Sequence, residues 1–195
     1  MIRLFTALCK IILENHSDYD LFLSSSAGFN HFDKRCPGCG SSAGLFPYGS
    51  YTRSLVTHED GNTKDYSIRP TRYKCKICGT THALLPDIVT PHSPYSLFFK
   101  LTALAAYYER DITVDAVCLS FGIAVSTLYE WKKRLHLHKA LLVGALANLK
   151  TPALTFIRSL MESVCLSDQL GGFFQKYAFS FLQGPKAAAT QSYPP

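Results

Sequence analysis

The 195-residue sequence has few charged residues, 17% of the total, and no long hydrophobic run. A largely disordered chain carries more charge, and here 47% of the residues are hydrophobic, enough for one moderate core or two small ones. The apolar stretch Leu141–Leu149 falls far short of the roughly 18 residues that span a bilayer. We therefore expect a folded, soluble protein without a membrane-spanning segment.

The chain also lacks the features of an export signal. Lys10 splits the apolar run of Met1–Leu13, and Asp18 and Asp20 follow it. Export would also place free thiols where they oxidise in pairs. We expect this stretch to pack as a strand or short helix in a cytoplasmic protein. The net charge of +6 permits contact with a polyanion but does not demand it.

Two cysteine pairs are the most informative feature that the sequence does contain. They are Cys36-Pro37-Gly38-Cys39-Gly40 and Cys75-Lys76-Ile77-Cys78-Gly79. A two-residue spacing lets a tight turn direct both thiolates at one metal, and the following glycine can take the positive φ of that turn. We predict that one Zn²⁺ is bound by Cys36, Cys39, Cys75 and Cys78. The alternative is two disulfides or four free thiols.

The residues between and just after the pairs predict a ribbon with a long hairpin. Residues 48–57 and 65–73 are rich in strand formers, and Glu59-Asp60-Gly61-Asn62 supplies a turn between them. Pro70 has no N–H to donate, so we expect an edge or a bulge there. His82 could replace a cysteine as a ligand, but with four thiolates present we expect it to be hydrogen-bonded at the edge of the ribbon.

Prolines at 86, 91 and 94 separate this ribbon from a helical region. Ser96 is expected to cap a helix that ends at Glu109-Arg110-Asp111. A short helix then runs from Thr113 or Asp115 to Ser120, and a second runs over 125–136.

The turn between these two helices has the features of a helix-turn-helix. Gly122 stands where a left-handed residue is needed, and Cys118 stands where two crossing helices leave room only for a small side chain. We expect the inward face to be formed by Val117, Phe121, Ile123, Leu128 and Trp131. The predicted burial of Cys118 argues against a catalytic thiol.

The outward face of the second helix is polar and basic, as in a helix that reads DNA. We predict base contacts from Ser126, Tyr129, Glu130 and Lys133, with Thr127, Lys132 and Arg134 nearer the phosphate backbone. The alternative is an ordinary solvated helix end, whose basic residues the helix dipole favours.

Several of these motifs together resemble a known family. They are Cys-Pro-Gly-Cys-Gly at 36–40, Cys-Lys-Ile-Cys-Gly-Thr-Thr-His-Ala-Leu-Leu-Pro-Asp at 75–87, Pro-Tyr-Ser at 94–96 and Gly-Ile-x-x-Ser-Thr-Leu-Tyr-x-Trp at 122–131. They look like an uncharacterised bacterial family, domain of unknown function 6431, and resemble the N-terminal part of insertion-sequence transposases. The resemblance covers residues 1–137 and implies zinc at the four cysteines and a DNA-reading helix over 126–134. Pro70 and Ala124 depart from the pattern.

Residues for catalysis are missing. Strand transfer by a transposase needs three carboxylates around two metal ions, and after Trp131 the acidic residues are Glu162 and Asp168 alone. Gly171-Gly172 lacks the lysine and the spacing of a phosphate loop, and no serine nucleophile motif is present. We predict no enzyme activity and no small-molecule substrate.

The C-terminal region, 139–183, alternates apolar stretches with breaks at Thr151-Pro152 and Gly171-Gly172. Two apolar helix faces are expected from Leu141, Leu142, Ala145 and Leu149, and from Leu154, Ile157, Leu160, Met161 and Val164, with an aromatic set of Phe173, Phe174, Tyr177 and Phe181. These faces pack on the chain's own core or form a homodimer that covers two DNA half-sites.

The sequence thus predicts an α+β protein with a zinc-ribbon β-hairpin unit followed by an all-α helix-turn-helix unit. The expected parts are the N-terminal segment and ribbon (1–90), the helix-turn-helix (91–138), the C-terminal helices (139–183) and a disordered tail (184–195). The function favoured is zinc-dependent binding of double-stranded DNA, as a transposase-like accessory factor or a transcriptional regulator. The alternative is a zinc-ribbon protein interaction module without DNA contact.

Overall fold

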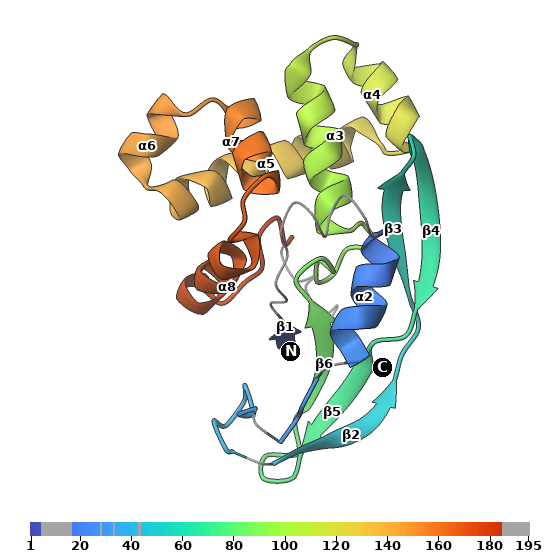
Figure 1. Cartoon of the computed structure of the whole chain (residues 1–195), viewed down its shortest axis with the longest axis vertical. Coiled ribbons are helices and arrows are strands. Elements are labelled where there is room, and N and C mark those ends of the chain that lie inside the picture. Colours follow the sequence, from blue (N-terminus) through green and yellow to red (C-terminus); the bar gives the residue numbers. More distant parts are fainter. Residues whose placement is uncertain (5–16, 28, 33, 43, 185–195) are drawn as a thin grey trace, which may run out of the picture.

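The computed structural model describes residues 1–4, 17–27, 29–32, 34–42 and 44–184, and these residues form an α+β fold with two small sheets and seven helices. Strands gather toward one end of the long axis and most helices toward the other (Figure 1). The β3–β4 hairpin runs along one side and reaches the helical end. The expected mixed class is therefore confirmed.

The first sheet has four strands in the order β1-β6-β5-β2. Their bounds are Ile2–Leu4 (β1), Leu45–Ser50 (β2), Thr71–Cys75 (β5) and Thr81–Pro86 (β6). β1 pairs parallel to β6, whereas β5 pairs antiparallel to both β6 and β2. The expectation that the first residues form a strand holds for Ile2–Leu4, and residues 5–16 lie outside the described part of the chain.

The long hairpin expected from the sequence is divided in two. β3 (Arg53–Glu59) and β4 (Asn62–Ile68) form their own two-stranded sheet, while β2 and β5 belong to the first sheet. Pro70 lies in the gap between β4 and β5, where its missing N–H cannot support a continuous ladder. Each of the strand-forming stretches 48–57 and 65–73 therefore contributes to two strands, and the interruption expected at Pro70 is found there. The turn is confirmed, because Glu59 pairs with Asn62 and Gly61 has φ +75°.

Helix α2 (Asp18–Ala27) was not predicted, although its start has a recognisable signal. The Ser17 hydroxyl accepts from the Asp20 amide at 3.1 Å, and the Asp20 carboxylate accepts from the Ser17 amide at 3.2 Å. This reciprocal pair is a capping box with aspartate in place of glutamate. The helix then packs against the strands, where Tyr19 stacks on Tyr66 with ring centroids 4.5 Å apart.

Helices α3 (Leu97–Glu109), α4 (Val114–Phe121) and α5 (Val125–Val143) follow the predicted boundaries closely at their starts. Ser96 caps α3 by accepting from the Phe99 amide at 2.9 Å, and Thr113 caps α4. Ala124 precedes α5 without a side-chain cap. The prediction that this helix ends at His136 is wrong, since it continues to Val143 and carries its apolar face into contact with the C-terminal helices.

The α4–α5 junction has the expected geometry. Gly122 adopts φ +64°, and the two helix axes differ in direction by 101°. The predicted inward residues are all buried, namely Val117, Cys118, Phe121, Ile123, Leu128 and Trp131. Within the described residues no single helix is long and apolar enough to cross a membrane, and α4 with α5 reaches that length and composition only as a sharply bent pair.

Three helices follow α5, namely α6 (Ala145–Lys150), α7 (Ala153–Met161) and α8 (Leu166–Tyr177). Thr151-Pro152 is a break as expected. Gly171-Gly172 is not, because both glycines lie inside α8, where burial of Leu170 and Phe173 outweighs the roughly 1 kcal/mol helix penalty of each glycine. Leu149 and Val164 are exposed rather than inward. Except for Gly184, the predicted tail lies outside the described residues.

One large core connects the hairpin to the helices. Leu55 and Ile68 of the hairpin share it with residues of α2, α3, α4, α5, α7 and α8, including Phe99, Trp131 and Ile157. At the tip of the hairpin, the Thr63 hydroxyl donates to the Phe121 carbonyl at 3.2 Å. The hairpin therefore ends against the α4–α5 turn.

Candidate functional site

The four predicted ligands lie together at the strand end of the molecule. The sulfurs of Cys36, Cys39, Cys75 and Cys78 are all within 4.8 Å of one another. Cys36 Sγ lies 3.7 Å from Cys78 Sγ, and Cys39 Sγ lies 3.7 Å from Cys75 Sγ. A disulfide would bring two sulfurs to about 2.05 Å, so the disulfide alternative does not describe this arrangement.

The spacing of the sulfurs fits one metal ion. Four sulfurs placed tetrahedrally at the metal–thiolate distance of about 2.3 Å are separated by about 3.8 Å. The observed 3.7 Å separations agree with that value. We call the two Cys-x-x-Cys-Gly motifs, residues 36–40 and 75–79, the knuckles. Each close pair of sulfurs joins one cysteine from each knuckle, so a single ion would cross-link two segments that are far apart in the sequence.

The two knuckles have the same backbone design. In the first, the Gly40 amide donates to the Cys36 carbonyl and the Cys36 amide to the Ser41 carbonyl, at 2.8 and 2.9 Å. In the second, the Gly79 amide donates to the Cys75 carbonyl and the Cys75 amide to the Thr80 carbonyl, both at 3.0 Å. Gly40 and Gly79 have φ of +73° and +70°, as the sequence predicts for these turns.

Hydroxyl groups next to the sulfurs were missed by the sequence analysis. The Ser41 hydroxyl lies 3.1 Å from Cys39 Sγ and 3.5 Å from Cys75 Sγ. Its hydrogen bond lowers the pKa of Cys75 to about 6, and a hydrogen bond from Thr80 lowers the pKa of Cys78. Both hydroxyls stand two residues after a cysteine, in Cys-Gly-Ser and Cys-Gly-Thr, and this repeated spacing was the available signal.

Burial acts in the opposite direction on Cys36. It raises the pKa of this thiol to about 11, because a thiolate there loses its hydration. Cys36 and Cys75 are buried, whereas Cys39 and Cys78 are exposed. A cation among the sulfurs would compensate the charge of a buried thiolate, so the donor set is suited to a metal and binding would release protons.

His82 lies beside the cluster without belonging to it. The side chain is buried, and its Nε2 is 3.3 Å from Cys36 Sγ. Its Nδ1 is 3.2 Å from the Met1 amino nitrogen. The ring thus connects β1 to the sulfur cluster, which agrees with the expected hydrogen-bonding role at the edge of the ribbon. Outer contacts of this kind orient ligand atoms.

The predicted DNA contacts lie along the first half of α5, away from the cysteines. Ser126, Tyr129, Glu130 and Lys133 are exposed, and Thr127, Lys132 and Arg134 are half-buried. The cysteine cluster lies in the strands at the opposite end of the long axis (Figure 1). The seven α5 residues and the four cysteines therefore form two separate candidate sites.

Two of the basic side chains on α5 are held by neighbours. Lys132 Nζ donates to the Tyr107 hydroxyl at 2.9 Å and lies 5.0 Å from the centroid of the Tyr107 ring. Arg134 forms an ion pair with Glu130 at 3.3 Å, one helical turn before it. Such an exposed pair contributes only about 0.3–0.5 kcal/mol. Lys133 is exposed to solvent, whereas Lys132 and Arg134 are half-buried.

No curated protein and no solved structure matches this sequence. The likeness to insertion-sequence transposases stays a prediction. The stretch from the first cysteine of the cluster to Trp131 of α5, residues 36–131, matches the profile of an uncharacterised protein family, Domain of unknown function (DUF6431).

Proposed function

We propose that this protein binds double-stranded DNA through α4 and α5 and holds one structural Zn²⁺ in the cysteine cluster. The observation that carries the DNA proposal is the 101° crossing of the two helices around the left-handed Gly122. Helix-turn-helix units join two helices at about 90–120° through a short turn, and their second helix enters the major groove.

The exposed part of α5 supports this interpretation. Recognition helices present their N-terminal residues to base edges. Here Ser126, Tyr129 and Glu130 are exposed within the first two turns of α5, and Lys133 follows one turn later. Hydroxyl, carboxylate and ammonium groups can each hydrogen-bond to a base edge or a phosphate.

The proposed zinc has a structural role. Four cysteines complete a tetrahedral shell, as in structural rather than catalytic zinc sites. The surrounding core is small, so the metal would supply much of the free energy that orders this end. The chain continues from β2 into the β3–β4 hairpin, whose Thr63 contacts Phe121, and this is the route by which a metal would affect the α4–α5 turn.

On this proposal the protein is a DNA-binding factor without a catalytic role of its own. It would serve as a transposase-like accessory factor or as a transcriptional regulator in the cytoplasm. A homodimer formed through the C-terminal helices would place two α5 helices on two half-sites. The exposed Leu146 and Leu149 of α6 are apolar residues that such an interface would cover.

The test is DNA affinity of the full, zinc-loaded chain, measured by fluorescence anisotropy at several salt concentrations with a duplex selected from random sequences. Lys133→Ala should weaken binding by about 1–3 kcal/mol and reduce the salt slope by about 1. Lys150→Ala, which removes an exposed lysine from α6, is the matched control and should change neither quantity.

Equal affinity of the parent and Lys133→Ala would contradict the role of α5. Binding that hardly responds to salt would contradict phosphate contact altogether, because released counterions make DNA affinity fall steeply as salt rises. That second result would favour the alternative, a zinc-ribbon module that docks another protein by apolar contacts.

A further inference from the structure

The exposed face of the β2–β5 ribbon carries three pairs of an aromatic ring and a cation. Lys76 Nζ lies 5.9 Å from the centroid of the Phe46 ring, and Lys74 Nζ lies 4.9 Å from that of Tyr48. The Arg72 guanidinium lies 4.6 Å from the centroid of the Tyr51 ring. We call these six residues the aromatic–cation ladder.

The ladder follows from strand geometry. Arg72, Lys74 and Lys76 alternate along the chain, so their side chains share one face, while Tyr73 and Cys75 point to the small core on the other. Phe46 pairs with Lys74 in the β2–β5 register. The rings therefore lie on the solvent side, and Tyr48 is 55% exposed.

The charge of this face is of one sign. Strands β2, β5 and β6 contain Arg72, Lys74 and no acidic residue. Each of the three cations lies over a ring, and among the residues that the structure describes none of them forms an ion pair with a carboxylate. Such a surface is complementary to a polyanion that also presents flat aromatic groups.

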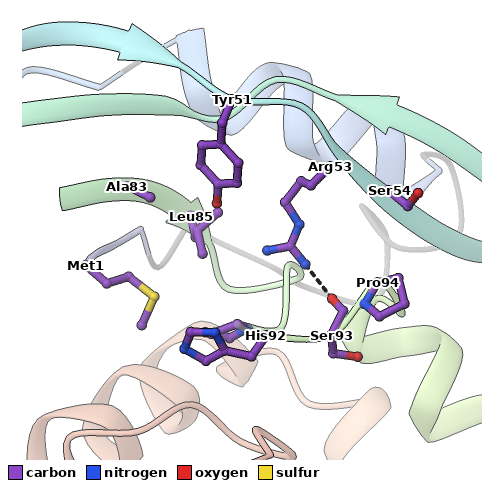
Figure 2. Close-up of a pocket in the computed structure, with 10 residues that line it drawn as sticks. Met1, Tyr51, Arg53, Ser54, Ala83, Leu85, His92, Ser93 and Pro94 are labelled. Atoms are coloured by element: carbon purple, nitrogen blue, oxygen red, sulfur yellow. Dashed lines mark hydrogen bonds between the residues drawn. The ribbon is translucent and has the colours of Figure 1, made fainter. Parts of the chain in front are cut away.

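A pocket lies at one end of the ladder. It has a volume of about 670 Å³, within the range of ligand sites, and Tyr51 belongs both to the ladder and to the pocket wall. Figure 2 shows the Tyr51 hydroxyl, the Arg53 guanidinium and the His92 ring directed into the same space. Arg53 is held by the carbonyls of Ser93 and Thr90.

We propose that this face binds single-stranded DNA, with bases stacked on the rings of the ladder, phosphates beside its cations and one unpaired base in the Tyr51–Arg53–His92 pocket. Alternate residues of a strand advance by about 6.6 Å, roughly twice the 3.4 Å rise of stacked duplex DNA. This spacing suits an extended strand whose bases are splayed apart.

A single strand with unpaired bases can contact both the rings and the cations of the ladder. In a duplex the faces of the bases are already stacked on each other, so they cannot stack on the exposed rings. A duplex would therefore interact with this face only through its phosphates. Single-strand binding proteins combine a positive track with aromatic stacking platforms, and each stacked base contributes about 1–3 kcal/mol. The site is separate from α5 and does not depend on the duplex proposal.

The experiment measures the affinity of the full, zinc-loaded chain for fluorescein-labelled oligodeoxythymidylate of about 10 nucleotides, a length within known site sizes. Tyr48→Ala should weaken binding about 10-fold, the loss of one stacking ring. Tyr48→Phe should keep the parent affinity, since it keeps the ring. Phe32→Ala removes another exposed aromatic residue, 66% exposed, and should have no effect.

Zinc content and the fluorescence of Trp131, the single tryptophan, should be the same in all variants, which shows that each is folded. Duplex affinity should be unchanged by Tyr48→Ala, and oligodeoxythymidylate affinity unchanged by Lys133→Ala. Parent-like binding by Tyr48→Ala, or an equal loss in Phe32→Ala, would overturn the proposal. Tighter binding of oligouridylate than of oligodeoxythymidylate would overturn the assignment to DNA in favour of RNA.

Discussion

The two ends of this molecule are stabilised in different ways. At the strand end the buried apolar cluster is small, and it consists of Ile2, Cys36, Leu45, Tyr73, Cys75 and Leu84. At the helical end one continuous core joins the β3–β4 hairpin to six helices, with side chains as large as Phe99 and Trp131 fully or almost fully buried. Small cores rarely sustain a fold without a disulfide or a metal.

The candidate metal ligands are part of the smaller of the two cores. Two of the six residues in the small cluster, Cys36 and Cys75, are themselves candidate metal ligands. Loss of an ion bound there would therefore release a cross-link and leave two thiol side chains of the small core without their partner. The helical end has no such dependence, because its core consists of ordinary apolar side chains packed against each other.

The largest effect is expected from Cys75→Ser. Three remaining thiolates cannot complete the tetrahedral shell, and metal binding at structural sites is worth about 10–16 kcal/mol of folding free energy. Zinc content should fall from one per chain to none, and protease should cleave the strand end. Trp131 fluorescence should stay native, since this residue reports on the helical core.

Cys165→Ser is the matched control for this change, because Cys165 is exposed and outside the cluster. It should keep full zinc content. Loss of the native Trp131 signal in Cys75→Ser would show instead that the two ends unfold together, and the distinction between them would be wrong.

An intermediate effect is expected in the helical core, where a substitution should lower stability without loss of zinc. Leu135 of α5 is fully buried, and Leu135→Ala should lower the free energy of unfolding by about 2–5 kcal/mol through lost burial and a cavity. Urea denaturation followed by Trp131 fluorescence measures it. Leu137→Ala on the same helix, 59% exposed, should cost less than about 0.5 kcal/mol.

Zinc content should be one per chain in both leucine variants. Loss of zinc from Leu135→Ala while Trp131 remains native would mean that the helical core supports the metal site directly, which the separation of the two buried clusters does not predict.

The smallest effect is expected at the tip of the β3–β4 hairpin, where the chain that continues from β2 contacts the α4–α5 turn. Thr63→Val removes the hydrogen bond to the Phe121 carbonyl and should cost about 0.5–1.5 kcal/mol. Chelation should also shift the Trp131 unfolding midpoint less in this variant than in the parent. Thr52→Val, at an exposed threonine between β2 and β3, is the control. An unchanged response to chelation in Thr63→Val would show that this contact does not connect the ends.

Features that depend on a few neighbouring residues were predictable from the sequence. The knuckle turns at Gly40 and Gly79, the Ser96 cap and the left-handed Gly122 all agree with the structure. In each case a backbone torsion or a single side-chain hydrogen bond determines the outcome, so a short motif contains the necessary information. The closeness of the four sulfurs follows from the same local turns once the strands pair.

Features set by tertiary packing were not predictable. Nothing local shows that β2 and β5 join one sheet while β3 and β4 join another, or that Gly171 and Gly172 remain helical. The ladder was missed for the same reason. The rings that lie next to Lys74 and Lys76 belong to Tyr48 and Phe46, which come from another strand.

β2 and β5 lie next to the knuckles, the chain continues from them into the β3–β4 hairpin, and the tip of that hairpin contacts the α4–α5 turn, so a metal and a duplex would bind at opposite ends of two consecutive strand pairs. Binding equilibria connected in this way are reciprocal. Whatever factor zinc adds to the affinity for DNA, DNA adds to the affinity for zinc. On the proposed function, protein bound to duplex DNA should therefore keep its metal at a chelator concentration that removes the metal from the free protein.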